Sequence, residues 1–189
     1  MRRLLLALPL TLLPLTAAMA ADAHEHGSLG AHEHGVGRLD VALDGRTLEF
    51  EFDSPSMNIV GFEHEASTPE DKAKIVAARE FLQKSHALFS VPEAAHCSVQ
   101  SQKLESPLFG DKVEDHDHDD DAKAGEHHEH SEIHGHYVFV CDAPGVITKL
   151  DLTQIFKDFP ATQKILVQAV SPRGQFGAEA TPAKASFKF

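Results

Sequence analysis

This chain of 189 residues lacks any cluster of basic residues, and its acidic residues outnumber lysine and arginine by 29 to 17. A negatively charged surface without a basic patch repels nucleic acid, so we exclude a nucleic-acid partner and expect cations as small partners. The sequence patterns of common enzymes are also missing, since there is no HExxH, GxSxG, P-loop or dinucleotide-binding fingerprint. The sequence therefore makes no case for catalysis.

Strongly apolar segments are missing after the first twenty residues, "MRRLLLALPLTLLPLTAAMA". Basic residues, an apolar run and a small-residue end are typical of a secretory signal peptide, which predicts cleavage after Ala20 and no stable membrane insertion. A membrane anchor is the alternative, but this run is short and is interrupted by Pro9 and Pro14. Removal of Arg2 and Arg3 with the peptide changes the formal charge from −12 to −14.

Cysteine is scarce, with Cys97 and Cys141 as the only two. In an exported chain, an oxidising compartment favours a disulfide between them. A thiolate metal site is the competing interpretation, and the absence of CxxC spacing argues against it.

The remaining pattern indicates an α+β fold. Alternating apolar residues predict a hairpin over residues 37–55 that turns at Asp44-Gly45, and further strands over "HYVFVC", "KILVQAVS" and the C-terminal residues. A helix is expected over residues 68–89, capped by Thr68, and a shorter one before Pro160. Because "KILVQAVS" is apolar on both faces, we expect it to be central. We predict an antiparallel β-sheet with helices packed on one face.

Residues 111–136 do not fit a packed domain. They hold seven histidines, ten acidic residues and two lysines, and Val113 and Ile133 are their only larger aliphatic residues. Such a segment buries too little apolar surface to offset its ordering entropy, which predicts a long disordered His/Asp-rich loop. We therefore expect a signal peptide at 1–20, a His-rich segment at 21–35, and a single domain at 36–189 that carries this loop.

Histidine is what the chain has in excess, with 14 residues. The pentapeptide AHEHG occurs twice near the expected mature N-terminus, and His-x-His recurs in the acidic segment. In an extended segment such a pair lies on one side, about 6.5 Å apart, so that both rings can reach one ion. Neutral imidazole suits zinc and other divalent transition metals, and the alternative is a merely soluble polar tail. The predicted ligands are His24, His26, His32, His34, His116, His118, His127, His128, His130, His134 and His136.

The order of several motifs resembles one known family. The motifs "HEHG", "SPSMNIVGFEH", "LFSVPEAAHC", "HYVFVCDAP", "IFKDFP" and "GQFGAEATP" follow one another as they do in the ZrgA-type family of small periplasmic zinc-uptake proteins. The resemblance implies zinc binding in the periplasm in support of a zinc import system, which lies in the inner membrane. Taken alone, His64 is an exposed loop histidine, but the resemblance implies that it is a ligand, with His32 and His34 as companions.

The leading hypothesis is therefore a periplasmic accessory protein that captures zinc through its histidines and supports import of the ion. A second hypothesis is a periplasmic buffer that protects against excess copper, nickel or zinc. A third is a metal-dependent hydrolase, which would need a rigid site of three ligands beside a carboxylate.

Overall fold

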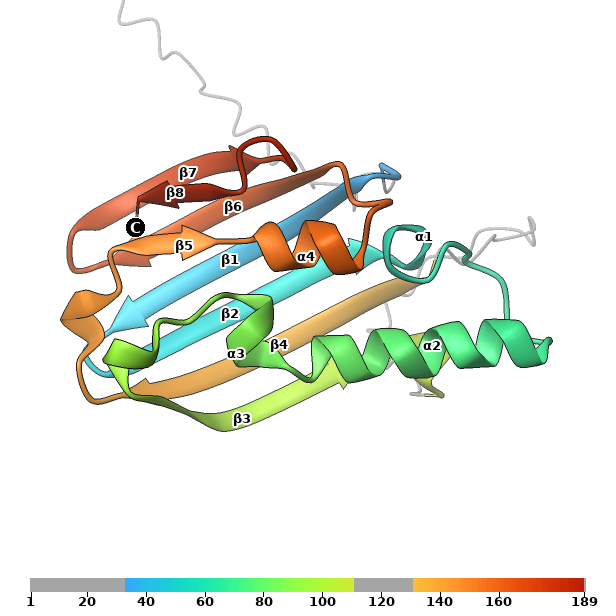
Figure 1. The fold of residues 1–189 in the computed structure, drawn as a ribbon, viewed down its shortest axis with the longest axis horizontal. Coiled ribbons are helices and arrows are strands. Elements are labelled where there is room, and N and C mark those ends of the chain that lie inside the picture. The colour runs from blue at the N-terminus through green and yellow to red at the C-terminus, as the bar shows by residue number, and fades with distance from the viewer. Residues whose placement is uncertain (1–32, 111–130, 189) are drawn as a thin grey trace, which may run out of the picture. The chain divides into compact units, whose positions relative to one another are not determined.

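The structure is a computed structural model that describes residues 33–110 and 131–188 (Figure 1). Its strands are β1 (Val36–Asp44), β2 (Thr47–Pro55), β3 (Cys97–Glu105), β4 (Glu132–Cys141), β5 (Lys149–Asp151), β6 (Lys164–Ser171), β7 (Gly174–Ala180) and β8 (Ser186–Lys188). Its α-helices are α1 (Ser56–Ile59), α2 (Pro69–Leu82), α3 (Ser85–Leu88) and α4 (Thr153–Asp158). Short 3₁₀ helices occupy Glu93–Ala95, Pro107–Phe109 and Pro144–Val146. The expected signal peptide lies outside the described residues.

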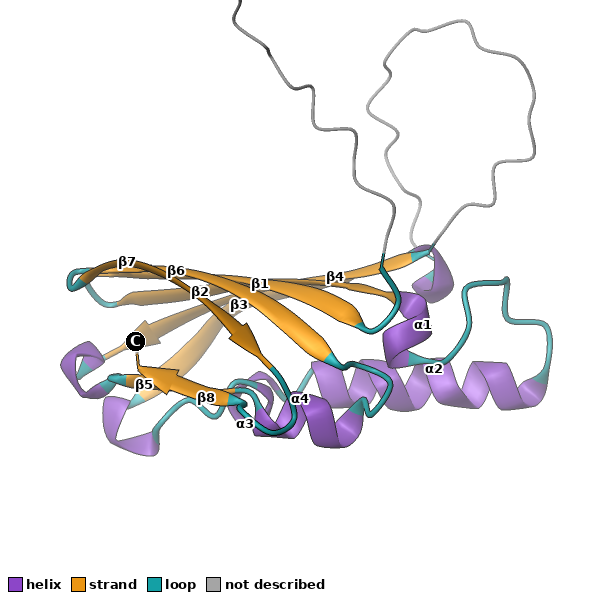
Figure 2. Cartoon of the chain, turned by 90° about the horizontal axis from the view of Figure 1, so that it is seen from above, coloured by secondary structure: helices purple, strands orange, loops and turns teal. Residues whose placement is uncertain are grey.

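Among the described strands, six form one sheet with the order β3-β4-β2-β1-β6-β7 (Figure 1). Neighbouring strands run antiparallel, except that β1 and β6 are parallel. Helices α2, α3 and α4 lie on one face of this sheet together with the small β5–β8 pair (Figure 2). The predicted α+β class is confirmed. We call the opposite face, which carries Glu49, Glu51, His134 and His136, the open face.

The covered face of the sheet carries the hydrophobic core. The ring of Phe50 stacks on Phe89 with the ring centroids 4.1 Å apart, and Phe139 meets Phe50 edge-on at 5.8 Å. The alternation predicted for three strands is confirmed, because their inward positions are all buried: Leu39, Val41, Leu43, Leu48, Phe50, Phe52, Tyr137, Phe139 and Cys141.

The hairpin and the "KILVQAVS" strand differ from expectation in detail. Asp44 pairs with Thr47, so the turn consists of Gly45 and Arg46 rather than Asp44 and Gly45. Gly45 has a φ of +55°, which glycine adopts at little cost. Strand β6 lies between β1 and β7, next to the edge strand, and its Val170 is 48% exposed on the open face. The strand is thus an interior one, as expected, but its apolar residues are not all buried on the open face.

The helix predicted over residues 68–89 is two helices. Its start is confirmed, since Thr68 and Asp71 form a reciprocal capping box and Pro69 occupies the first turn. The chain leaves the helix at Gln83 and begins the separate turn α3 at Ser85, which brings Leu88 and Phe89 under the sheet. Burial of these two side chains against the sheet thus overrides the helical continuity that the sequence favours.

Cys97 and Cys141 form a disulfide, as predicted. The two residues face each other across β3 and β4, which places the bond at one end of the pair of strands. Because both sulfur atoms are bonded, the competing thiolate metal site is excluded.

Strand β4 starts earlier than the sequence predicts. It begins at Glu132, so the expected loop at 111–136 is too long at its C-terminal end, and residues 111–130 lie outside the described residues. Ile133 and Gly135 occupy buried positions on the covered face. The alternation of buried and exposed residues along the strand therefore extends into the His-rich segment. The abundance of histidine and acidic residues concealed this period-2 pattern.

Gly135 is needed at its position because of a close neighbour. A Cβ atom there would lie 2.7 Å from Cε2 of the Tyr137 ring, and that ring is fully buried against Phe89. Alanine in place of glycine usually favours a strand, but here we expect Gly135→Ala to lower the free energy of unfolding by about 1–3 kcal/mol through overpacking. Chemical denaturation checks this. Gly145→Ala is the control, because no atom lies within 4 Å of its Cβ position. Equal losses in the two variants would contradict the expectation.

Candidate metal centre

Four of the predicted metal ligands lie within the described residues: His34, His64, His134 and His136. The other predicted ligands lie outside them, namely His24, His26, His32, His116, His118, His127, His128 and His130. Each of these four predicted ligands makes a polar contact with an acidic residue. The contact is to the carboxylate of that residue or, for His64, to its backbone carbonyl.

Strands β2 and β4 bring acidic residues and histidines together on the open face. Alternation along β2 directs Glu49, Glu51 and Asp53 to this face, and alternation along β4 directs His134 and His136 to it. The antiparallel register then pairs Glu51 with His136 and Asp53 with His134. The expectation that this His-x-His pair shares one side is confirmed, but its two rings contact different carboxylates.

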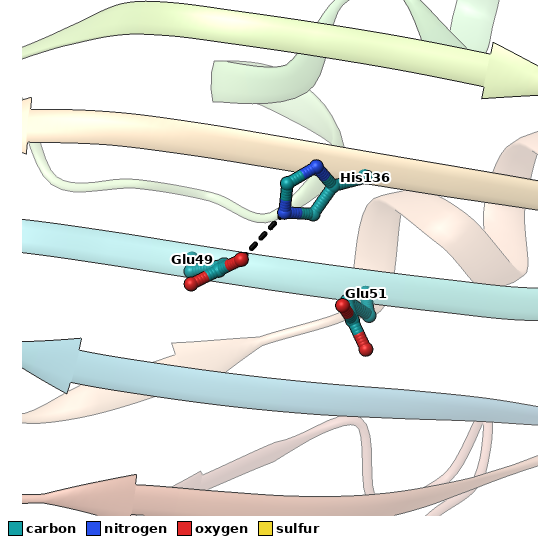
Figure 3. A group of neighbouring side chains, drawn as sticks. All are labelled: Glu49, Glu51 and His136. Atoms are coloured by element: carbon teal, nitrogen blue, oxygen red, sulfur yellow. Dashed lines mark hydrogen bonds and ion pairs between the residues drawn. The ribbon is translucent and has the colours of Figure 1, made fainter.

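Glu49, Glu51 and His136 form one compact group (Figure 3). One ligand atom from each residue lies within 4.8 Å of the other two. Nε2 of His136 is 2.5 Å from Oε1 of Glu49, and both side chains are about two-fifths exposed, at 41% and 40%. An imidazole and two carboxylates that converge in this way are a donor set for a divalent transition metal. Among the described residues, this is the one such group of three or more.

His134 is held on both sides by carboxylates. Its Nδ1 is 2.6 Å from Oδ1 of Asp53, and its Nε2 is 3.4 Å from Oε2 of Glu132. The hydrogen bond to Asp53, with the charges of Asp53, Glu132 and Glu105, raises the pKa of His134 despite its partial burial. A protonated ring has no lone pair for a metal. Without a metal nearby, this arrangement thus favours His134 as the cationic partner of two carboxylates.

His34 contacts the segment that connects β2 to α2, which we call the 56–64 segment. Its Nε2 is 3.1 Å from Oε1 of Glu63. The neighbouring backbone is fixed by Asn58, which is buried and accepts a hydrogen bond of 2.6 Å from the Gly35 N–H while donating to the Val36 carbonyl. The His34 backbone is therefore attached to a rigid part of the fold.

Ser131, where the described chain resumes, contacts the same 56–64 segment. Its carbonyl accepts from the Ser56 N–H at 2.9 Å, and its hydroxyl donates to the Glu63 carbonyl at 3.4 Å. His34 and Ser131, which border the undescribed residues 1–32 and 111–130, therefore contact the same part of the folded body.

His64 is exposed and is oriented by two contacts. Its ring stacks on Phe62 with centroids 4.7 Å apart. Its Nδ1 lies 3.0 Å from the Glu65 carbonyl, which can only accept, so Nδ1 carries the proton and donates. The neutral ring then has its lone pair on Nε2, which is the usual arrangement of a metal-binding histidine. His64 and His34 do not form a group of three ligands with any described residue, so their joint site stays a prediction.

Sequence reasoning missed the carboxylates of this region. Glu49, Glu51 and Asp53 are the outward positions of "TLEFEFDSP", and the hairpin pattern alone assigns them no role as ligands. The signal was present, because acidic residues at every second position gather on one face of a strand. Their partner strand was not evident, since β2 and β4 are distant in sequence.

Comparison with known proteins identifies one family. The model of a family described as "ZrgA family zinc uptake protein" matches residues 31–189. No curated protein matches the chain. Within the described parts of the chain, no helix has both the length and the apolar character needed to cross a membrane.

Proposed function

Because this chain belongs to the ZrgA family of zinc uptake proteins, we propose that it is a periplasmic accessory protein that captures zinc through its histidines and supports import of the ion. One observation carries the proposal: the 56–64 segment contacts both His34, at the end of the N-terminal His-rich sequence, and Ser131, at the C-terminal end of residues 111–130. Histidines tethered to one place raise the local concentration of bound zinc there. A disulfide agrees with an oxidising compartment such as the periplasm.

The tight site in this proposal is built on His64, with His32 and His34 as companions. The donor contact of Nδ1 with Glu65 and the stacking on Phe62 orient the ring before zinc arrives. Because this ring is already oriented, zinc binding loses little free energy to ordering the side chain. The site therefore binds zinc more strongly than the segment at 111–130. The import system in the inner membrane then takes zinc from the protein.

Zinc titration of the chain without residues 1–20 tests this site. We expect one tight site and several weaker ones, and we expect deletion of residues 115–130 to remove only weaker sites. His64→Ala should weaken the tight site by at least about tenfold, since loss of a residue that only supports a metal ligand already costs about 10- to 100-fold in affinity. His86→Ala is the matched control, because His86 lies in α3 and contacts Phe139 instead. The proposal is wrong if the deletion variant binds no zinc.

A further inference from the structure

We propose that Glu49, Glu51 and His136 form a fixed Zn²⁺ site on the open face of the sheet, separate from the site built on His64. The inference deepens the proposed function and rests on it for the identity of the ion. The site uses ligands from β2 and β4 alone, so all of it belongs to the folded body.

The geometry needs only small side-chain movements. Zinc–ligand distances of about 2.0–2.2 Å place two ligand atoms of a tetrahedral site about 3.4 Å apart. The three ligand atoms already lie within 4.8 Å of one another, and Nε2 of His136 is 2.5 Å from Oε1 of Glu49. Rotation of these partly or fully exposed side chains can bring the separations to the required value. Because Glu49 and His136 are partly exposed, water can fill the remaining position on the ion.

The negative charges of Glu51 and Asp40 favour a cation at the site. Glu51 lies directly opposite Asp40 across β1 and β2, and like charges in this position destabilise a sheet. Among the described residues, neither side chain has an ion pair with a lysine or arginine. Lys103, which lies opposite His136 on β3, pairs with Glu105 at 2.7 Å. A divalent ion at Glu51 would offset this repulsion.

The backbone that carries the ligands is rigid. Strand β2 is hydrogen-bonded to β1 and β4, and β4 is hydrogen-bonded to β2 and β3, so both strands have neighbours on each side. A site on such strands keeps its spacing without an ordering cost. One imidazole with two carboxylates suits zinc, whereas Ca²⁺ requires a larger set of oxygen ligands.

Backbone amide NMR of residues 21–189, titrated with ZnCl₂, tests the inference. We expect zinc to shift the amide signals of residues 49–51 and 135–137, and Glu51→Gln to weaken this response at least about tenfold. Glu51→Gln should fold normally, because Glu51 is exposed and the change removes its repulsion with Asp40. Glu179→Gln is the control, because Glu179 is an exposed residue of β7 on the same face. This substitution removes the same charge as Glu51→Gln.

The outcomes separate this inference from the proposed function. Zinc binding that shifts signals near His64 but not those of β2 and β4 would overturn the inference and leave the function intact. The absence of any zinc binding would overturn both. CaCl₂ could instead shift the same amide signals as much as ZnCl₂ does, with no change in the His136→Gln variant. That result would show that the acidic surface attracts any divalent cation, and it would also overturn the inference. A zinc-specific response that both Glu51→Gln and His136→Gln remove would support it.

Discussion

Replacement of Phe50 by alanine is expected to lower the free energy of unfolding by about 3–5 kcal/mol, the range for deleting a buried aromatic ring. Phe50 is fully buried, stacks on Phe89 and meets Phe139 edge-on, so the variant loses contacts with both the sheet and the layer that covers it. A domain of this size is stabilised by only about 5–15 kcal/mol, which makes the loss a large fraction of the total.

Urea denaturation of the two forms measures this effect. The matched control is Phe81→Ala, which makes the same chemical change at a side chain that is 39% exposed and should cost much less. A loss at Phe50 no larger than the loss at Phe81 would show that the aromatic cluster is not the centre of the core.

Removal of the disulfide has the second large effect. The bond closes a loop with a sequence separation of 44, for which the chain-entropy estimate is about 4 kcal/mol. Strand β3 is an edge strand bonded only to β4, so the disulfide also fastens its first residue to the sheet. We expect the double variant Cys97→Ser, Cys141→Ser to unfold at a clearly lower urea concentration.

The wild-type protein with and without reductant provides the control for this prediction. The reduced wild-type protein should unfold close to the double variant, and addition of reductant should not affect the variant. An unchanged midpoint for the wild-type protein in reductant would mean that the bond does not contribute to stability.

Local patterns in the sequence predicted much of the fold. Alternation in the first hairpin and in β4 identified the buried side chains, and the capping residues Thr68 and Asp71 located the start of α2. These features depend on residues that are close in the chain, where spacing alone determines which side chains share a face. The break after Leu82 was not predictable, because it depends on how Phe89 packs beneath the sheet.

Strand order and the carboxylate partners of the histidines depend on distant residues. Nothing local in β2 indicates that β4 is its neighbour, and therefore nothing local indicates that Glu51 meets His136. Composition predicts the histidines as ligands but gives no information on their surroundings. For this reason the sequence predicts His134 and His136 in a disordered loop, whereas the structure places both on β4.

The parallel pairing of β1 with β6 has a consequence for how the protein folds. Strand β1 is made early, but its partner β6 comes late, since Val36 pairs with Lys164. A hairpin of β1 and β2 that forms first has both outer edges unpaired until β4 and β6 join it, and such non-local pairings make folding slow, on the scale of about milliseconds to seconds. The Gly35 carbonyl also accepts hydrogen bonds from the N–H groups of Gln163 and Lys164, next to His34. The backbone beside His34 therefore reaches its final position only when this distant part of the chain has docked.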